Sequence, residues 1–109
     1  MRALIVAITL AGIASPCLGQ TMTGSTINGV RTGWNADSFA VTTVEPIVNP
    51  ANCTTPDGYI SDKSLPGYTT YYAAALTALM TASPLVVVTV HNTECFAGRP
   101  KLIGINLKR

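Results

Sequence analysis

The sequence has few charged and few aromatic side chains. Of its 109 residues, 11% are Asp, Glu, Lys or Arg and 6% are Phe, Trp or Tyr. A domain that binds nucleic acid usually carries a dense basic stripe interleaved with aromatic residues. The one basic cluster here is C-terminal and is interrupted by apolar residues: Arg99, Lys101, Lys108 and Arg109. We therefore expect no nucleic acid among the partners. A surface this poor in charge also favours self-association, because a second copy would cover part of it.

Histidine and cysteine are also scarce, with one histidine and three cysteines. His91 and Cys95 are four residues apart, but two ligands do not make a zinc site, which needs three or four. Catalysis by His91 would need a nucleophile and an orienting carboxylate. The acidic residues are scattered through expected loops without such a spacing: Asp37, Asp57, Asp62 and Glu94. We expect no catalytic residue, no metal site and no cofactor.

The longest apolar run is too short to cross a membrane. Residues 3–13 are mostly apolar, whereas a transmembrane helix needs roughly 20 apolar residues. With Arg2 before this run and small residues after it, residues 1–19 have the pattern of a signal peptide. We expect export, cleavage after Gly19 and no stable membrane insertion. Cleavage after Ala14 is the alternative, and it would leave all three cysteines in the exported chain.

Two cysteines, Cys53 and Cys95, remain once the leader is removed. An even number of cysteines in a small exported domain indicates a disulfide. Neither cysteine lies in a C-x-x-C motif, the spacing typical of a reactive pair, so we expect a structural bridge. It would close a loop of about forty residues, which the chain-entropy account values at ~4 kcal/mol. The protein is therefore expected to be secreted or periplasmic.

The rest of the chain predicts one small domain at residues 26–109, preceded by a flexible N-terminal arm at residues 20–25. Runs of β-branched residues bounded by turn residues predict five strands, and alanine-rich periodicity predicts one helix. The strands are expected at residues 26–32, 39–45, 59–63, 85–91 and 101–107, the helix at 68–82, and long loops at 46–58 and 92–100. The order β-β-β-α-β-β is that of an OB-fold, a partly open five-stranded barrel. The expected fold class is mainly β with one helix.

The expected helix carries no charged residue. Three- and four-residue spacing assigns its core face to Tyr68, Tyr72, Leu76 and Leu79. Tyr71 is left for a subunit contact or for solvent. A helix on the surface of a monomer would ordinarily carry Lys or Glu on its opposite face. The uncharged face therefore favours a homo-oligomer, with a lightly solvated face of small residues as the alternative.

The turn between the first two strands holds the one candidate ligand site. It contains the only tryptophan beside short polar side chains, and the candidate residues are Trp34, Asn35, Asp37 and Ser38. Sugar sites pair an aromatic face with polar groups that hydrogen-bond the sugar hydroxyls. The alternative is a plain hairpin turn in which Trp34 covers the end of the barrel. Such turns need Asn, Asp and Gly for backbone reasons alone.

These features together resemble a known group of proteins. They comprise a leader, a hairpin, a loop cysteine, a helix of the form YxxYYxxxLxxLxxA, a V-x-V strand and a second cysteine. This arrangement is similar to the B subunits of AB-type toxins of the subtilase cytotoxin and pertussis-like class. The resemblance covers about residues 26–107, and it implies an OB-fold, a pentameric ring around the helices and binding of sialylated glycans. The chain is shorter than those subunits and has fewer aromatic residues, and none of their sugar-binding residues is carried over.

The sequence thus favours a secreted, noncatalytic binding module whose ligand is a glycan or a protein. The alternatives are a small periplasmic hydrolase or enzyme inhibitor, and a structural envelope protein without a small ligand.

Overall fold

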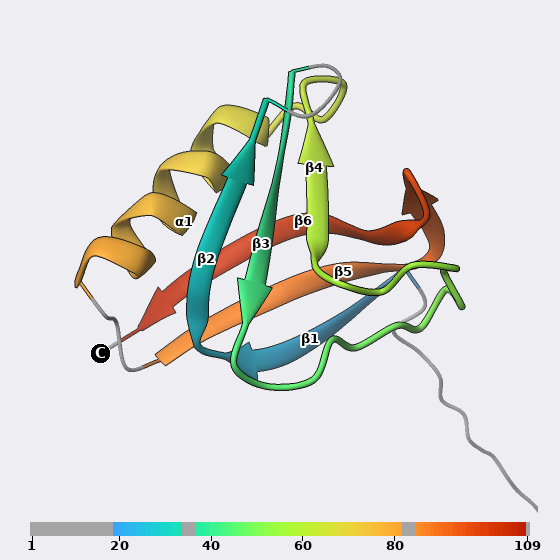
Figure 1. Cartoon of the computed structure of the whole chain (residues 1–109), viewed down its shortest axis with the longest axis horizontal. Helices are drawn as coiled ribbons and strands as arrows, with labels where there is room; N and C mark the ends of the chain where they lie inside the picture. The colour runs from blue at the N-terminus through green and yellow to red at the C-terminus, as the bar shows by residue number, and fades with distance from the viewer. Residues whose placement is uncertain (1–18, 34–36, 82–84, 109) are drawn as a thin grey trace, which may run out of the picture.

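The structure, a computed structural model, describes residues 19–33, 37–81 and 85–108 (Figure 1). Almost all of the expected leader lies outside these residues. The protein is mainly β with one helix, as the sequence predicts. Its elements are β1 (Gln20–Ser25), β2 (Ile27–Thr32), β3 (Ser38–Thr43), β4 (Tyr59–Asp62), α1 (Tyr68–Thr81), β5 (Leu85–Phe96) and β6 (Arg99–Lys108). The helix among the described residues is not long and apolar enough to span a membrane.

The six strands form one mixed sheet in the order β1-β5-β6-β4-β3-β2. Only β4 and β6 are parallel, with Ile60 opposite Lys101; the other neighbours are antiparallel. The sheet is not closed, because β1 and β2 lie at its two edges. These two strands are nevertheless separated in the chain by Thr26 alone. Figure 1 shows β2, β3 and β4 crossing β1, β5 and β6 at a steep angle.

The chain bends at Thr26, between the two edge strands. The Glu45 carboxylate accepts a hydrogen bond from the Thr26 amide at 2.6 Å and another from the Thr26 hydroxyl at 2.8 Å. The Val44 amide donates to the Thr26 carbonyl oxygen at 3.0 Å. The bend therefore has its own hydrogen-bond partners, which hold β1 and β2 in different directions.

The number of strands corrects the sequence prediction. Residues 20–25, expected as a flexible arm, form β1 and pair along β5 from Gln20 opposite His91 to Ser25 opposite Val86. The observed order therefore has six strands and is not the expected five-strand order. Small polar residues carry little strand signal of their own. Here the backbone hydrogen bonds to β5 decide the conformation, together with burial of Ser25.

The β5–β6 hairpin is longer than the sequence predicts. Residues 92–100, expected as a loop, belong mostly to the two strands, which are connected by Ala97 and Gly98. These two residues have φ values of 48° and 77°. Two consecutive residues with positive φ make the tight turn whose twist matches that of paired strands. Cys95 therefore lies in β5 rather than in a loop.

The core lies between the crossing strands and under α1. Its largest members are fully buried: Phe39, Val41, Tyr59, Val86, Val88, Val90 and Leu102. The helix packs against β2 and β6 and buries Ala75 and Ala78. Alanine has the smallest side chain that a helix can bury, so the helix axis lies close to the sheet.

The buried face of α1 also differs from the expected one. Leu76, assigned to the core face, is 36% exposed. Tyr71, expected at a subunit contact or in solvent, packs against the core together with Tyr68, Tyr72 and Leu79. The centre of the buried face thus runs through the alanines. The spacing pattern placed a leucine on the core face. The close approach of the helix to the sheet buries the alanines instead.

Candidate functional site

A pocket of about 350 Å³ lies where the turn between β2 and β3 meets the first turn of α1. Its volume is at the low end of the range for small-ligand pockets, ~300–1,000 Å³. The described residues that line it are Thr32, Gly33, Asp37, Ser38, Tyr68 and Tyr72. Hydroxyl groups, one carboxylate and two aromatic rings therefore meet at one end of the fold.

Backbone hydrogen bonds fix the strand side of the pocket. Gly33 follows β2 and has a φ of 73°, a conformation that favours glycine. Its amide donates to the Ser38 carbonyl oxygen at 3.4 Å, and the Lys63 amide donates to the Asp37 carbonyl oxygen at 3.3 Å. The residues next to the turn are thus held both to each other and to the chain that leaves β4.

The start of α1 fixes the other side. Pro66 and Gly67 precede the helix, where the Tyr68 amide donates to the Leu65 carbonyl oxygen at 3.1 Å. A Cβ atom on Gly67 would overlap the Tyr71 ring, so this position requires glycine for a close approach. Tyr68 and Tyr72 are one helical turn apart and therefore share a face.

Phe39 holds the two tyrosine rings of the pocket from below. Its side chain is 1% exposed. Its ring centroid lies 5.5 Å from that of Tyr68 at an interplanar angle of 45°, and 5.2 Å from that of Tyr72 at 57°. Tilted aromatic pairs at these distances are favourable beyond their buried area. The tyrosine rings are therefore held in place by the core rather than free to rotate in solvent.

The two sides of the pocket are joined by one hydrogen bond. The Tyr68 hydroxyl donates to Asp37 Oδ1 at 3.1 Å. Burial raises the pKa of Tyr68, and the hydrogen bond to the Asp37 carboxylate raises it further because a phenolate could not donate it. Tyr68 is thus kept as a neutral hydrogen-bond donor, and its proton is directed at Asp37.

The structure brings together part of the expected ligand site. Asp37 and Ser38 line the pocket, whereas Trp34 and Asn35 lie outside the described residues. Tyr68 and Tyr72, which the sequence assigned to the core alone, form its other side. No sequence signal pairs the helix start with the turn. A tyrosine immediately after Pro-Gly at a helix start is the one hint that its hydroxyl could stay accessible.

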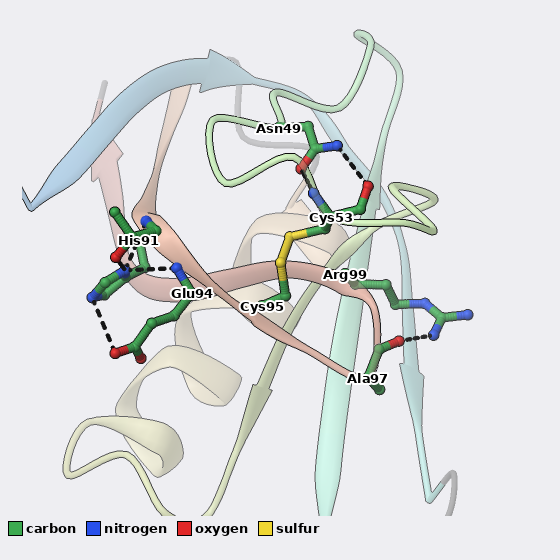
Figure 2. The surroundings of a disulfide bond; sticks show 8 residues. Asn49, Cys53, His91, Glu94, Cys95, Ala97 and Arg99 are labelled. Carbon is green, nitrogen blue, oxygen red and sulfur yellow. Dashed lines mark hydrogen bonds and ion pairs between the residues drawn. A yellow bond between two sulfur atoms is a disulfide. The ribbon is translucent and has the colours of Figure 1, made fainter.

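The disulfide between Cys53 and Cys95 is confirmed (Figure 2). Its Cα atoms are 5.8 Å apart, a usual separation for a disulfide. The Asn49 side chain holds the backbone of Cys53 on both sides, accepting from the Cys53 amide at 2.8 Å and donating to the Cys53 carbonyl oxygen at 3.0 Å. The bridge therefore fixes an otherwise irregular loop, residues 46–58, to the end of β5.

His91 has a structural role in the same region (Figure 2). Its Nδ1 accepts hydrogen bonds from the amides of Thr93 and Glu94, both at 3.1 Å. The Glu94 carboxylate bonds the Lys101 ammonium at 2.5 Å, and that contact lowers the pKa of Glu94. Within residues 19–33, 37–81 and 85–108, no three His, Cys, Asp or Glu side chains gather to hold a metal ion.

Comparisons with protein-family models, with curated proteins and with solved structures found no match to this chain.

Proposed function

We propose that the protein is an exported, noncatalytic glycan-binding module of the toxin B-subunit kind, and that the pocket at Asp37 and Tyr68 is its sugar site. The observation that carries the proposal is the direct hydrogen bond between these two residues, both of which line a small pocket. It joins the turn that contains Trp34 to a helix that supplies two fixed aromatic rings.

The chemistry of the pocket suits a sugar ring. Carbohydrate sites combine aromatic surfaces, which stack on the C–H face of a pyranose, with short polar groups that bond its hydroxyls. Tyr68 and Tyr72 supply aromatic surface held by Phe39. Asp37 and Ser38 supply a carboxylate and a hydroxyl on the opposite side. Trp34 follows Gly33 in the sequence and is the sequence's own candidate for a sugar-stacking side chain.

Two features of the sheet support an OB-like architecture. First, β1 and β2 are separated by Thr26 alone and occupy the two edges of the sheet. If they are the halves of one bent strand, the chain order reduces to β-β-β-α-β-β, the OB order. Second, the strand before the helix pairs in parallel with the last strand, which places the helix between them in the chain. The bend at Thr26 would then bring the sheet close to a barrel.

Export and assembly complete the proposal. The structural disulfide suits an oxidising compartment, and the leader predicted at residues 1–19 would deliver the chain there. On α1, Leu76 is 36% and Met80 81% exposed, on a helix without charge. Their exposure supports a homo-oligomer, with a pentameric ring as the form that the toxin resemblance implies.

A glycan array tests this function. Trp34→Ala and Tyr68→Phe should each abolish or strongly reduce glycan retention while the melting temperature stays nearly unchanged. Tyr71→Phe is the matched control, because Tyr71 lies on the same helix but does not belong to the pocket lining. If the unmodified protein retains no glycan, the proposal fails. A large loss of stability in Trp34→Ala would assign Trp34 to the core.

A further inference from the structure

The charges that line the pocket bear on which sugars it accepts, an inference that rests on the proposed function. The described lining contains one carboxylate, Asp37, and no Lys, Arg or His. Residues 34–36, which connect β2 and β3 in the sequence, are Trp-Asn-Ala and carry no charge. No cationic side chain of the turn is therefore placed to neutralise a negative ligand.

A second carboxylate adds to the negative potential at this end of the fold. Asp62, at the end of β4, contributes with Asp37 to raising the pKa of the Tyr68 hydroxyl, after the larger effect of burial. Asp62 Oδ1 accepts hydrogen bonds from the Ser64 amide at 2.9 Å and from the Ser64 hydroxyl at 2.5 Å. Lys63 follows Asp62 in the chain, and its backbone amide is bound to the Asp37 carbonyl oxygen. Its side chain does not line the pocket.

The hydrogen-bond donors and acceptors of the pocket also disfavour an anionic ligand. Tyr68 already donates its one proton to Asp37, so its oxygen is left as an acceptor. The Asp37 carboxylate accepts the hydrogen bond from Tyr68 and is exposed, with lone pairs beyond the one that Tyr68 uses. A ligand with several hydroxyl donors would complement this set, whereas an anionic ligand would bring further acceptors and a like charge.

We propose that the pocket binds an uncharged terminal hexose and discriminates against sialic acid. The hydroxyls of a neutral hexose would donate to Asp37 and Tyr68, and the ring would lie against the tyrosines. The carboxylate of a sialic acid would stand near Asp37 without a cation between them, and like charges at short range repel. This is the opposite of the preference that the toxin resemblance implies.

Matched pairs of glycans test the proposal. Lactose-terminated probes and their sialylated counterparts are titrated into the full exported chain at low and at physiological salt. The neutral probe should bind at least about tenfold more tightly, which corresponds to about 1.4 kcal/mol. Higher salt should reduce the ratio of the two affinities, because screening weakens the repulsion between the two carboxylates. Asp37→Asn keeps the size of the side chain and should reduce the ratio of the two affinities by about tenfold.

Glu94→Gln is the matched control. It removes the same charge from a residue outside the pocket lining, at the β5–β6 hairpin, and should leave the neutral-to-sialylated ratio unchanged. Equal or tighter binding of the sialylated probe would overturn the discrimination and leave the proposed sugar site standing. A ratio that Asp37→Asn does not change would also overturn it. Failure of every glycan to bind would overturn the proposed function, and this inference with it.

Discussion

Arg99 donates two hydrogen bonds to the carboxylate of Asp57, from Nε to Oδ1 at 2.6 Å and from Nη2 to Oδ2 at 3.2 Å. The two residues are 42 positions apart, the same separation as Cys53 and Cys95. Cys95 lies in β5 and Arg99 in β6, so the loop before β4 is fastened to both strands of the hairpin. Just beyond them Ile60 pairs in parallel with Lys101. The disulfide and the ion pair thus hold the loop against the hairpin next to the point where β4 begins to pair with β6.

Removing the disulfide should destabilise this arrangement. Cys53→Ser/Cys95→Ser should lower the free energy of unfolding by about 2–5 kcal/mol, because the bridge closes a loop spanning a 42-residue separation in the unfolded chain. Urea unfolding followed by circular dichroism measures the change. The double variant avoids the free thiol that a single substitution would leave. A stability equal to that of the parent would show that the other contacts of the loop suffice.

The Asp57–Arg99 pair should make stability depend on pH in the acid range. The hydrogen bond from Arg99, followed by the charges of Arg99 and Arg31, holds the pKa of Asp57 below its ordinary 3.8. A lowered pKa contributes stability that is present above about pH 3.8 and is lost as pH falls through the folded value. We expect Asp57→Asn to destabilise the protein at neutral pH by up to about 1 kcal/mol.

The difference between the parent and Asp57→Asn should shrink below about pH 4, as the parent protonates. Denaturation midpoints of both proteins from neutral to acid pH measure it. The stability of the variant is subtracted from that of the parent at each pH. This is needed because the pKa values of Glu45 and Glu94 are lowered as well and make both proteins sensitive to acid. A constant difference down to the lowest pH would contradict the assignment to Asp57.

Gly98 should tolerate no larger residue. Its φ is +77°, and an added Cβ would lie 2.9 Å from the Thr54 hydroxyl oxygen. Gly98→Ala should therefore cost about 1–2 kcal/mol of stability, through both the left-handed conformation and the contact. Gly24→Ala is the control, since a Cβ there meets nothing within 4 Å, and it should change stability by less than about 0.5 kcal/mol. Similar losses in both variants would contradict a special role for the turn.

The exposed apolar residues of α1 should control assembly. We expect the unmodified protein to have a multi-subunit mass by light scattering at micromolar concentration. Met80→Glu should reduce that mass with little effect on thermal unfolding, because the Met80 side chain is 81% exposed and a buried charge in an interface is costly. Thr70→Glu, also exposed on α1, is the charge-matched control. A monomeric parent protein would remove the oligomer from the proposal.

The sequence determined the local elements whose signals are short-range. The β-branched runs, the Pro-rich loop and the alanine-rich segment placed β2, β3, β4 and α1 to within a few residues, and the even cysteine count gave the correct disulfide. It misplaced β1 and the ends of β5 and β6. Their residues are small, polar or charged and have weak intrinsic strand preference, so pairing with a distant strand decides their conformation.

Sequence and tertiary structure also determine different parts of the pocket. The sequence by itself determined that short polar side chains follow β2 at a turn, because the residue types and the turn are both local, and Asp37 and Ser38 do line the pocket. Only the tertiary structure decided that Tyr68 and Tyr72 stand opposite them. That placement depends on the close packing of α1 through Ala75 and Ala78 and on the Phe39 side chain beneath the rings. A spacing pattern specifies which residues share a helix face, but the distance at which that face meets the sheet is set by the side chains packed between them.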